Sequence, residues 1–192
     1  MTELSTITEL QNRICLHEDK AAYRVLYDLL FPSLFRFSYS LVKSKEAAEE
    51  IVSDVFIKIW LIRTDLKEIG NLRSYMFKIT KNLSLNFIAE NSRVSILKLD
   101  DVSVNCYVSM NNPETYFISS ELDQKLKSVI ASLPTRSKIV FQLIKEDGLE
   151  YKEVAKILDI SVHTVRNLLA SAVRKIYEAI PAYVVKTTYS KK

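Results

Sequence analysis

The residues from Leu149 to Ile176 restrict the local fold more than any other stretch of the chain. Apolar residues recur there at helical spacing on both sides of a polar break at residues 159–161, which predicts two amphipathic helices joined by a tight turn. Ser161 is expected to cap the second helix because its hydroxyl can accept from free backbone N–H groups. Asp159 stands where such a turn often needs a positive φ, which Asp tolerates. This is the layout of a helix-turn-helix.

The second predicted helix of this motif has one apolar and one polar face. The inward stripe consists of Val165, Leu168, Leu169, Ala172 and Ile176. The outward side chains are His163, Arg166, Asn167, Ala170 and Arg174. Arg and Asn can make paired hydrogen bonds to guanine and adenine edges, and a basic residue late in the helix can meet phosphates. The pattern favours DNA binding, and the alternative is an ordinary helical hairpin whose polar face is solvated.

Composition favours an all-α fold and places the positive charge near this motif. A chain of 192 residues with only two glycines and four prolines lacks the turn residues that an all-β protein needs. Residues 1–92 carry 12 basic and 12 acidic side chains, whereas residues 119–192 carry 13 basic and 8 acidic ones. The net charge of +4 therefore comes from the segment with the helix-turn-helix, as phosphate binding requires.

Several functional classes are disfavoured by the residues present. Cys15 and Cys106 are far apart, so neither a disulfide framework nor a metal site is expected. No glycine-rich phosphate loop occurs, and His17 and His163 form no recognisable pair with a cysteine or a carboxylate cluster. We therefore expect no enzyme activity, no cofactor and no small-molecule substrate. The absence of a signal pattern and of a long apolar run predicts a cytoplasmic protein.

The first half of the chain predicts a small helical domain. Pro32 lies within the first apolar-periodic segment and predicts either two helices or one bent helix. Ser44 is expected to cap the next helix. The expected helices are Asp19–Val42, Lys45 to about Arg63 and Leu72 to about Glu90, with a loop at Thr64–Asn71.

The helix that follows Ser44 shows an unusual outer strip. Its inward face is expected to consist of Ala48, Val52, Val55, Phe56 and Ile59. The opposite strip contains Glu50, Ser53, Asp54, Ile57 and Leu61. Acidic residues beside exposed apolar ones suit a docking surface for a basic helical partner. A merely solvated face remains the alternative, because mixed strips are common on helices.

The helix from Leu72 to about Glu90 combines basic residues with an aromatic on its outer face. That face is expected to contain Ser74, Phe77, Lys78, Lys81 and Leu85. An exposed ring can stack on an unpaired base while lysines meet phosphates, so the face suits single-stranded nucleic acid. The alternative is that Phe77 is covered by another part of the protein.

The second half is expected to begin after a segment without periodicity. Residues 93–112 are interpreted as a linker, and Pro113 is expected to start a helix that ends at Leu133-Pro134. Another helix should stop at Asp147-Gly148, directly before the helix-turn-helix. The predicted architecture is therefore two small all-α domains, residues 1–92 and 113–192, joined by a flexible linker.

Two separated segments together resemble a known family. Ala48–Trp60 and Leu72–Ile88 resemble the second region of the extracytoplasmic-function sigma factors, and the chain from Leu133 to Val165 resembles their fourth region. The matching residues in the fourth region include Leu133-Pro134, Arg136, Phe141, Gly148-Leu149, Tyr151, Glu153-Val154-Ala155, Leu158, Ile160-Ser161 and Thr164-Val165. A helix-turn-helix by itself is weak evidence, whereas the two regions in family order are strong evidence.

The resemblance implies a subunit that directs bacterial RNA polymerase core to promoters. By that resemblance, the outer strip on the helix that follows Ser44 would dock on the clamp helices of the β′ subunit. The helices joined at Gly148 would meet the β flap. Promoter DNA would be contacted at its −10 and −35 elements, and an anti-sigma factor is a plausible partner. A stand-alone helix-turn-helix regulator is the alternative.

The implied contact residues fall into three groups. For polymerase docking they are Glu50, Ser53, Asp54 and Ile57. For the −10 element and its melting they are Asn71, Ser74, Phe77, Lys78 and Lys81. For the −35 element they are Ser161, His163, Thr164, Arg166, Asn167 and Arg174. Ser53 departs from the family pattern, which commonly has Gln there, and Asp159 replaces a common Gly.

Overall fold

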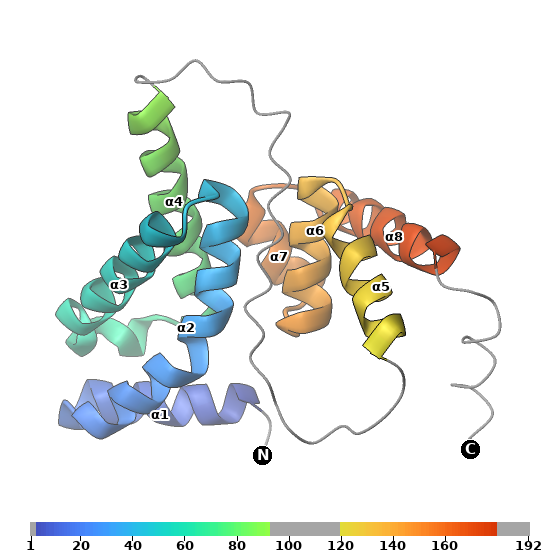
Figure 1. Ribbon diagram of the computed structural model, residues 1–192. Coiled ribbons are helices and arrows are strands. Elements are labelled where there is room, and N and C mark those ends of the chain that lie inside the picture. The colour runs from blue at the N-terminus through green and yellow to red at the C-terminus, as the bar shows by residue number, and fades with distance from the viewer. Residues whose placement is uncertain (1–2, 93–119, 180–192) are drawn as a thin grey trace, which may run out of the picture.

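The computed structural model describes residues 3–92 and 120–179, and its elements in these ranges are helical (Figure 1). The N-terminal part contains α1 (Glu3–His17), α2 (Lys20–Val42), α3 (Lys45–Leu61), the 3-10 helix η1 (Arg63–Glu68) and α4 (Leu72–Ser92). The C-terminal part contains α5 (Ser120–Ala131), α6 (Thr135–Phe141), the π-helical turn η2 (Gln142–Glu146), α7 (Tyr151–Leu158) and α8 (Val162–Ala179). None of these helices is long and apolar enough to cross a membrane. The expected all-α fold is confirmed.

Helix α1 is an element that the sequence reasoning did not predict. Ile7, Leu10 and Ile14 lie on one side of it at helical spacing and are buried. The Gln11 amide, also buried, donates to the carbonyl of Leu66 at 2.6 Å and to that of Ile69 at 2.7 Å. Helix α1 thus holds the segment between α3 and α4 in place.

Helix α2 is a single helix despite the proline inside it, as one of the two alternatives predicted. Asp19 caps its N-terminus by accepting from the backbone N–H groups of Ala21 and Ala22 at 2.9 and 3.0 Å. Pro32 lacks an N–H, so one intrahelical hydrogen bond is missing there, and Figure 1 shows a change of direction within α2.

The connection from α3 to α4 is more ordered than expected. Ser44 caps α3 as predicted, accepting from the Ala47 N–H at 3.2 Å. The segment predicted as a loop at Thr64–Asn71 instead contains most of η1, and Leu66 within it is fully buried. The loop prediction was wrong over these residues because one buried leucine and the contact with α1 order a segment that has no helical periodicity of its own.

The C-terminal part ends its helices where the sequence predicted. Gly148 adopts a φ of +65°, which glycine tolerates without strain, and it separates η2 from α7. Residues 93–112, interpreted as the linker, and the expected helix start at Pro113 lie outside the described residues, so those boundaries stay predictions.

The two parts of the molecule share one hydrophobic core. Leu143, Val154 and Ile157 of the C-terminal part belong to the same buried cluster as Leu72 and Met76 of α4. Helix α7 packs on α4, and α6 approaches α2 (Figure 1). The described helices of the two predicted domains are therefore in direct contact, which sequence periodicity did not indicate.

Candidate nucleic-acid interface

The turn between α7 and α8 has the predicted helix-turn-helix geometry. Asp159 adopts φ 53° and ψ 47°, and the next N–H, from Ile160, donates to the Ala155 carbonyl at 3.1 Å. Ser161 Oγ then accepts from the Thr164 N–H at 3.0 Å and caps α8. A left-handed residue and a side-chain cap together fix the angle between the two helices.

Helix α8 separates its two faces as the sequence indicated. Val165, Leu169, Ala172 and Ile176 are buried, and Leu168 is half-buried. His163, Arg166, Asn167, Ala170 and Arg174 are exposed. The apolar stripe orients the helix, so its polar side faces solvent.

The exposed face of α8 carries hydrogen-bonding groups close together. The Asn167 amide nitrogen lies 3.1 Å from His163 Nε2, and the hydroxyls of Ser161 and Thr164 lie 2.8 Å apart. Arg174 lies further along the helix, 3.9 Å from the Glu178 carboxylate. Hydroxyl, imidazole and amide groups near the start of the helix, with a guanidinium further along, suit base edges first and phosphates later.

The corresponding face of α4 does not lie open to solvent. Phe77 is fully buried, with its ring centroid 5.5 Å from that of Phe37 on α2, and Lys81 is only 7% exposed. The expectation that these two side chains face outward was wrong, and the alternative that Phe77 is covered is confirmed. The spacing of apolar residues indicated that only one side of α4 is buried. In the structure α4 packs against α2, α3 and α7, so more of its surface is buried.

The polar residues at the edge of α4 bind groups of the helix-turn-helix. Ser74 Oγ donates to the Glu153 carboxylate at 2.9 Å, and the Asn71 amide donates to the same oxygen. Lys81 forms an ion pair with Asp159. The hydrogen bond from Lys81, and then its charge, lower the pKa of the Asp159 carboxyl. Lys78 remains exposed beside this contact.

A second cluster of charges joins α2 and α4 to the end of η2. Arg36 Nη2 lies 2.8 Å from Asp147 Oδ1, and Arg73 donates to the Asp147 backbone carbonyl. The Asp147 side chain is 3% exposed, and this burial raises the pKa of its carboxyl, although a hydrogen bond from Ser33 and the charges of the two arginines act in the opposite direction. Sequence reasoning missed this cluster, because no local pattern links residues so far apart in the chain.

Buried hydroxyls on α4 were also missed. Ser84 Oγ lies 3.0 Å from Ser38 Oγ of α2, and the Thr80 hydroxyl donates to the Met76 carbonyl at 2.9 Å. The available signal was that Thr80 and Ser84 are small residues four positions apart, which allows close approach of a neighbouring helix. Their burial explains why α4 buries a wider sector than its apolar residues indicate.

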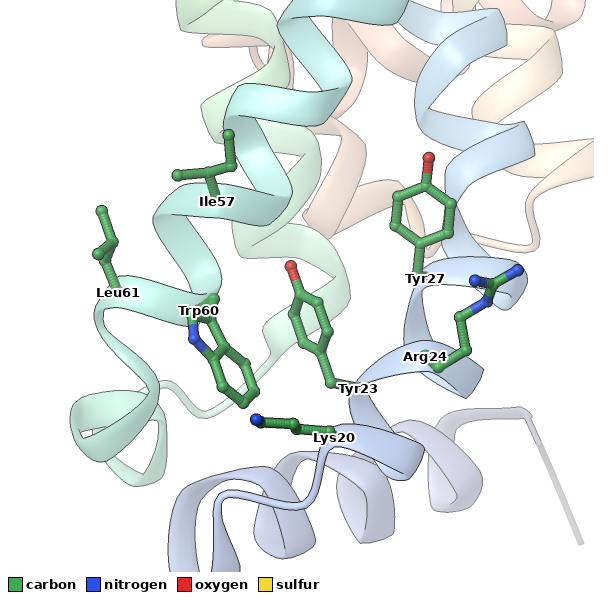
Figure 2. Close-up of a pocket in the computed structure, with 7 residues that line it drawn as sticks. All are labelled: Lys20, Tyr23, Arg24, Tyr27, Ile57, Trp60 and Leu61. Carbon is green, nitrogen blue, oxygen red and sulfur yellow. The ribbon is translucent and has the colours of Figure 1, made fainter.

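The acidic strip on α3 is exposed, as expected. Glu50, Ser53 and Asp54 face solvent, and Ile57 and Leu61 are 56% and 70% exposed. The strip borders a groove of about 760 Å³ between α2 and α3 (Figure 2). The side chains that line the groove are Lys20, Tyr23, Arg24, Tyr27, Ile57, Trp60 and Leu61.

The aromatic wall of this groove is held by a partly buried hydroxyl. Tyr23 donates to the Phe56 carbonyl at 2.8 Å, and its ring centroid lies 4.9 Å from that of Trp60. Burial raises the pKa of Tyr23 to about 12, so the hydroxyl stays protonated and keeps donating. The groove was not anticipated, although Tyr23 and Tyr27 are one helical turn apart.

Comparison with known proteins identifies the family. The Sigma-70 region 2 family matches residues 26–94, and the Sigma-70, region 4 family matches residues 123–176. The chain is 28% identical over 130 residues to the ECF RNA polymerase sigma-E factor of Escherichia coli, covering 64% of this chain and 68% of that protein. The chain belongs to the extracytoplasmic-function subfamily of sigma factors.

Other relatives agree with this assignment. The ECF RNA polymerase sigma factor SigE of Mycolicibacterium smegmatis is 22% identical over 157 residues, covering 82% of this chain, and the chain spans 61% of that relative's length. Among solved structures, the fold is similar to the sigma factor RpoE in complex with the anti-sigma factor NepR from Bartonella quintana. That match has a TM-score of 0.59 and 19% identity, covering 82% of this chain and 95% of the other.

A second solved structure has the same fold. CnrH in complex with the cytosolic domain of CnrY matches with a TM-score of 0.56 and 18% identity, covering 90% of this chain and 96% of that one. In this sigma factor, the region 2 match contains the α3 strip and all of α4, and the region 4 match contains the helix-turn-helix.

Proposed function

We propose that the chain directs bacterial RNA polymerase core to specific promoters, reading a −35 element with α8 and opening a −10 element with the polar edge of α4. The observation that carries the proposal is the pairing of an exposed polar face on α8 with a separate exposed strip of acidic and apolar side chains on α3, in a chain that matches sigma regions 2 and 4 in order. Such a role requires no catalytic group of its own and is performed in the cytoplasm.

The −35 contact is assigned to the exposed end of α8. Arg166 and Asn167 are exposed and would bond guanine and adenine edges, whereas the exposed Ser161, Thr164 and Arg174 would meet phosphates at the two ends of the groove. His163 lies beside Asn167 and orients its amide. The excess of five positive charges in residues 119–192 adds a sequence-independent attraction to DNA.

The −10 contact is assigned to Asn71, Ser74, Lys78 and Lys81. These amide, hydroxyl and ammonium groups are donors that suit phosphates and the edges of unpaired bases. Phe77 has a different role, because a fully buried ring cannot stack on a base; it packs against Phe37 and supports the helix that carries the donors.

Polymerase docking is assigned to the α3 strip and the neighbouring groove. Glu50, Ser53 and Asp54 supply acceptors, and Ile57 lies both on the strip and in the wall of the groove. Acidic residues beside an apolar groove suit a partner that presents basic and apolar side chains from a helix, such as the clamp helices of β′. The β flap and an anti-sigma factor complete the proposed partners.

The deciding experiment is run-off transcription with purified RNA polymerase core on a library of genomic fragments. The proposal expects transcripts that start at a limited set of related sequences and depend on the chain. Tight, specific binding of duplex DNA by the chain in the absence of core, without transcripts when core is added, would instead support a stand-alone helix-turn-helix regulator.

Replacing Asp54 by Lys tests the docking surface. The reversal of charge on the exposed strip is expected to weaken association with core by about tenfold, because one close charge contact of about 1.4 kcal/mol corresponds to that factor. Pull-down with tagged core measures it. Glu9→Lys on α1 makes the same reversal away from the strip and should bind like the wild type. Equal binding by both variants would show that the strip is only solvated.

A further inference from the structure

Helix α1 hydrogen-bonds to the connection between α3 and α4 at three points. Its Gln11 amide donates to the carbonyls of Leu66 and Ile69 at 2.6 and 2.7 Å. One helical turn later, the Cys15 thiol donates to the Thr64 carbonyl at 3.3 Å. Helix α1 packs along η1 (Figure 1), and it lies outside residues 26–94, which match the region 2 family. The family match therefore assigns no role to this contact.

The Gln11 amide bridges the point at which η1 ends. The Leu66 carbonyl belongs to the last turn of η1 and also accepts from the Ile69 N–H at 3.0 Å. Ile69 itself has an extended backbone, with φ −94° and ψ 100°, so its carbonyl lies outside that turn. A side-chain amide nitrogen carries two N–H groups, and here they are used on carbonyls three residues apart. One side chain therefore fixes the direction in which the chain leaves η1.

The packing of α1 does not by itself require an amide at this position. Gln11 is 7% exposed and lies on the side of α1 that carries the buried Ile7, Leu10 and Ile14. An apolar side chain of the same size would be buried there without the cost of removing a polar amide from water. What the amide adds is direction, because its hydrogen bonds hold two carbonyl groups at defined positions.

The segment that Gln11 holds presents polar side chains beside the start of α4. Lys67 and Glu68 lie between the two held carbonyls in the sequence, and both are exposed. Asn71 follows two residues after the second carbonyl and is exposed as well. Its Oδ1 accepts from the Ser74 N–H at 2.9 Å and caps α4. Asn71 therefore joins the held connection to the helix that the proposed function assigns to the −10 element.

We propose that Gln11 is a positioning residue for base selection at the −10 element. It does not contact DNA; it fixes the connection whose exposed Lys67, Glu68 and Asn71 meet the edge of an unpaired base. The inference rests on the proposed function and adds a residue that determines its specificity. Base selection requires donors and acceptors held to within about 0.5 Å, whereas phosphate contacts carry no sequence information. Loss of the Gln11 hydrogen bonds therefore lowers selectivity more than it lowers promoter binding.

Gln11→Met is the main variant, because it removes both donors and keeps a side chain of nearly the same length. Gln11→Asn is a milder second variant, since its amide is one methylene shorter and cannot reach both carbonyls. The matched control is Ile14→Val, which removes one methylene from the same buried side of α1 and keeps the hydrogen bonds. All are made in the full chain.

Base preference is measured with RNA polymerase core on a promoter found by run-off transcription. The −10 element is randomised in one template pool and the −35 element in another, and each template carries a transcribed barcode that identifies it. In Gln11→Met, the preference at one or two −10 positions should fall by about fivefold or more, the lower end of what one base contact contributes. Gln11→Asn should show a smaller fall at the same positions. The −35 preference, which α8 is proposed to read, should stay at the wild-type value in both variants.

This measurement separates positioning from a merely structural role. A preference is a ratio between templates, so it does not depend on the fraction of chains that are active. A variant that only folds less well lowers transcription from all templates equally and keeps the ratio. Amide hydrogen exchange of the free chain supplies a second readout without DNA. Gln11→Met should speed exchange in residues 63–71 by about fivefold relative to Ile14→Val, as expected for the loss of a hydrogen bond.

The inference is overturned if Gln11→Met keeps the wild-type −10 preference, whether or not exchange in the connection becomes faster. An equal loss of preference in Ile14→Val would also overturn it, because the effect would then come from the packing of α1. Failure of the proposed function gives a different result. Absence of transcripts from the wild type with core rejects the polymerase assignment and this inference with it. Transcripts whose −10 preference survives the loss of Gln11 reject the inference alone.

Discussion

Helices α8 and α4 both carry polar residues assigned to promoter DNA, yet only α8 presents them to solvent. On α8, a single apolar stripe packs into its own half of the molecule and the opposite side stays open. On α4, Phe77 and Lys81 are buried although both were predicted to face outward. The difference arises because α8 lies at the edge of the fold, whereas α4 lies between α2, α3 and α7.

A helix face that points away from the core of its own domain is not always exposed to solvent. A helix can turn a polar side away from the core of its own domain and still bury it against the other domain. Lys81 and Ser74 lie on such a side, and their partners, Asp159 and Glu153, come from the other half of the chain. Burial of polar groups is tolerated there because each one has a hydrogen-bonding partner.

The largest expected effect is that of Phe77→Ala. Removing a fully buried ring should lower the free energy of unfolding by about 3–5 kcal/mol through lost burial and the cavity left behind. Urea denaturation followed by circular dichroism measures this change. Leu85→Ala on the same helix, at a side chain that is 48% exposed, should cost less than about 0.5 kcal/mol. Similar costs for both variants would contradict the contrast between the covered and open parts of α4.

A smaller effect, of a different kind, is expected from Arg166→Ala on α8. Its side chain is exposed, so the free energy of unfolding should change by less than about 0.5 kcal/mol. Discrimination between matched and mismatched −35 sequences should fall by about 1–3 kcal/mol if the guanidinium bonds a base edge. Run-off transcription on paired templates measures it, with Tyr177→Ala as an exposed control on the same helix. Unchanged discrimination would remove Arg166 from the reading face.

The smallest expected effect is the pH dependence of the covered side. Burial raises the pKa of Asp147 above its ordinary value of 3.8, so the folded chain binds this proton more tightly than the unfolded chain does. The resulting stability is fully present below pH 3.8 and is lost as pH rises through the raised folded pKa.

Denaturation of the wild type and of Asp147→Asn from about pH 4 to about pH 7 tests this sign. The stability of the wild type relative to the Asn variant should fall as pH rises, because only the wild type must ionise a buried carboxyl. A relative stability that rises with pH would contradict this sign. It would show that the two arginines stabilise the ionised carboxylate of Asp147 by more than burial destabilises it.

Helix caps, positive φ positions and the buried side of α8 could be predicted from the sequence, because each depends on residues close together in the chain. Ser44 and Ser161 cap helices, Gly148 and Asp159 adopt positive φ, and the α8 stripe is buried, each for a reason contained within a few residues. The polar side chains of α8 and the α3 strip were predicted on exposed faces for the same reason, and they are exposed. Helix α1 and η1 were missed because their order depends on Gln11 and Leu66, which contact each other across more than fifty residues of chain.

The sequence by itself determined most of the helices, the caps at Ser44 and Ser161, the polar side of α8 and, through two motifs in order, the sigma-factor family. Only the tertiary structure decided that α7 lies on α4, that Phe77 belongs to the core, and that Asp147 is buried between arginines of α2 and α4. The spacing of apolar residues along a helix indicates which side of that helix packs against apolar neighbours. It does not record which distant carboxylate meets which distant donor, because that pairing depends on how the two halves pack together.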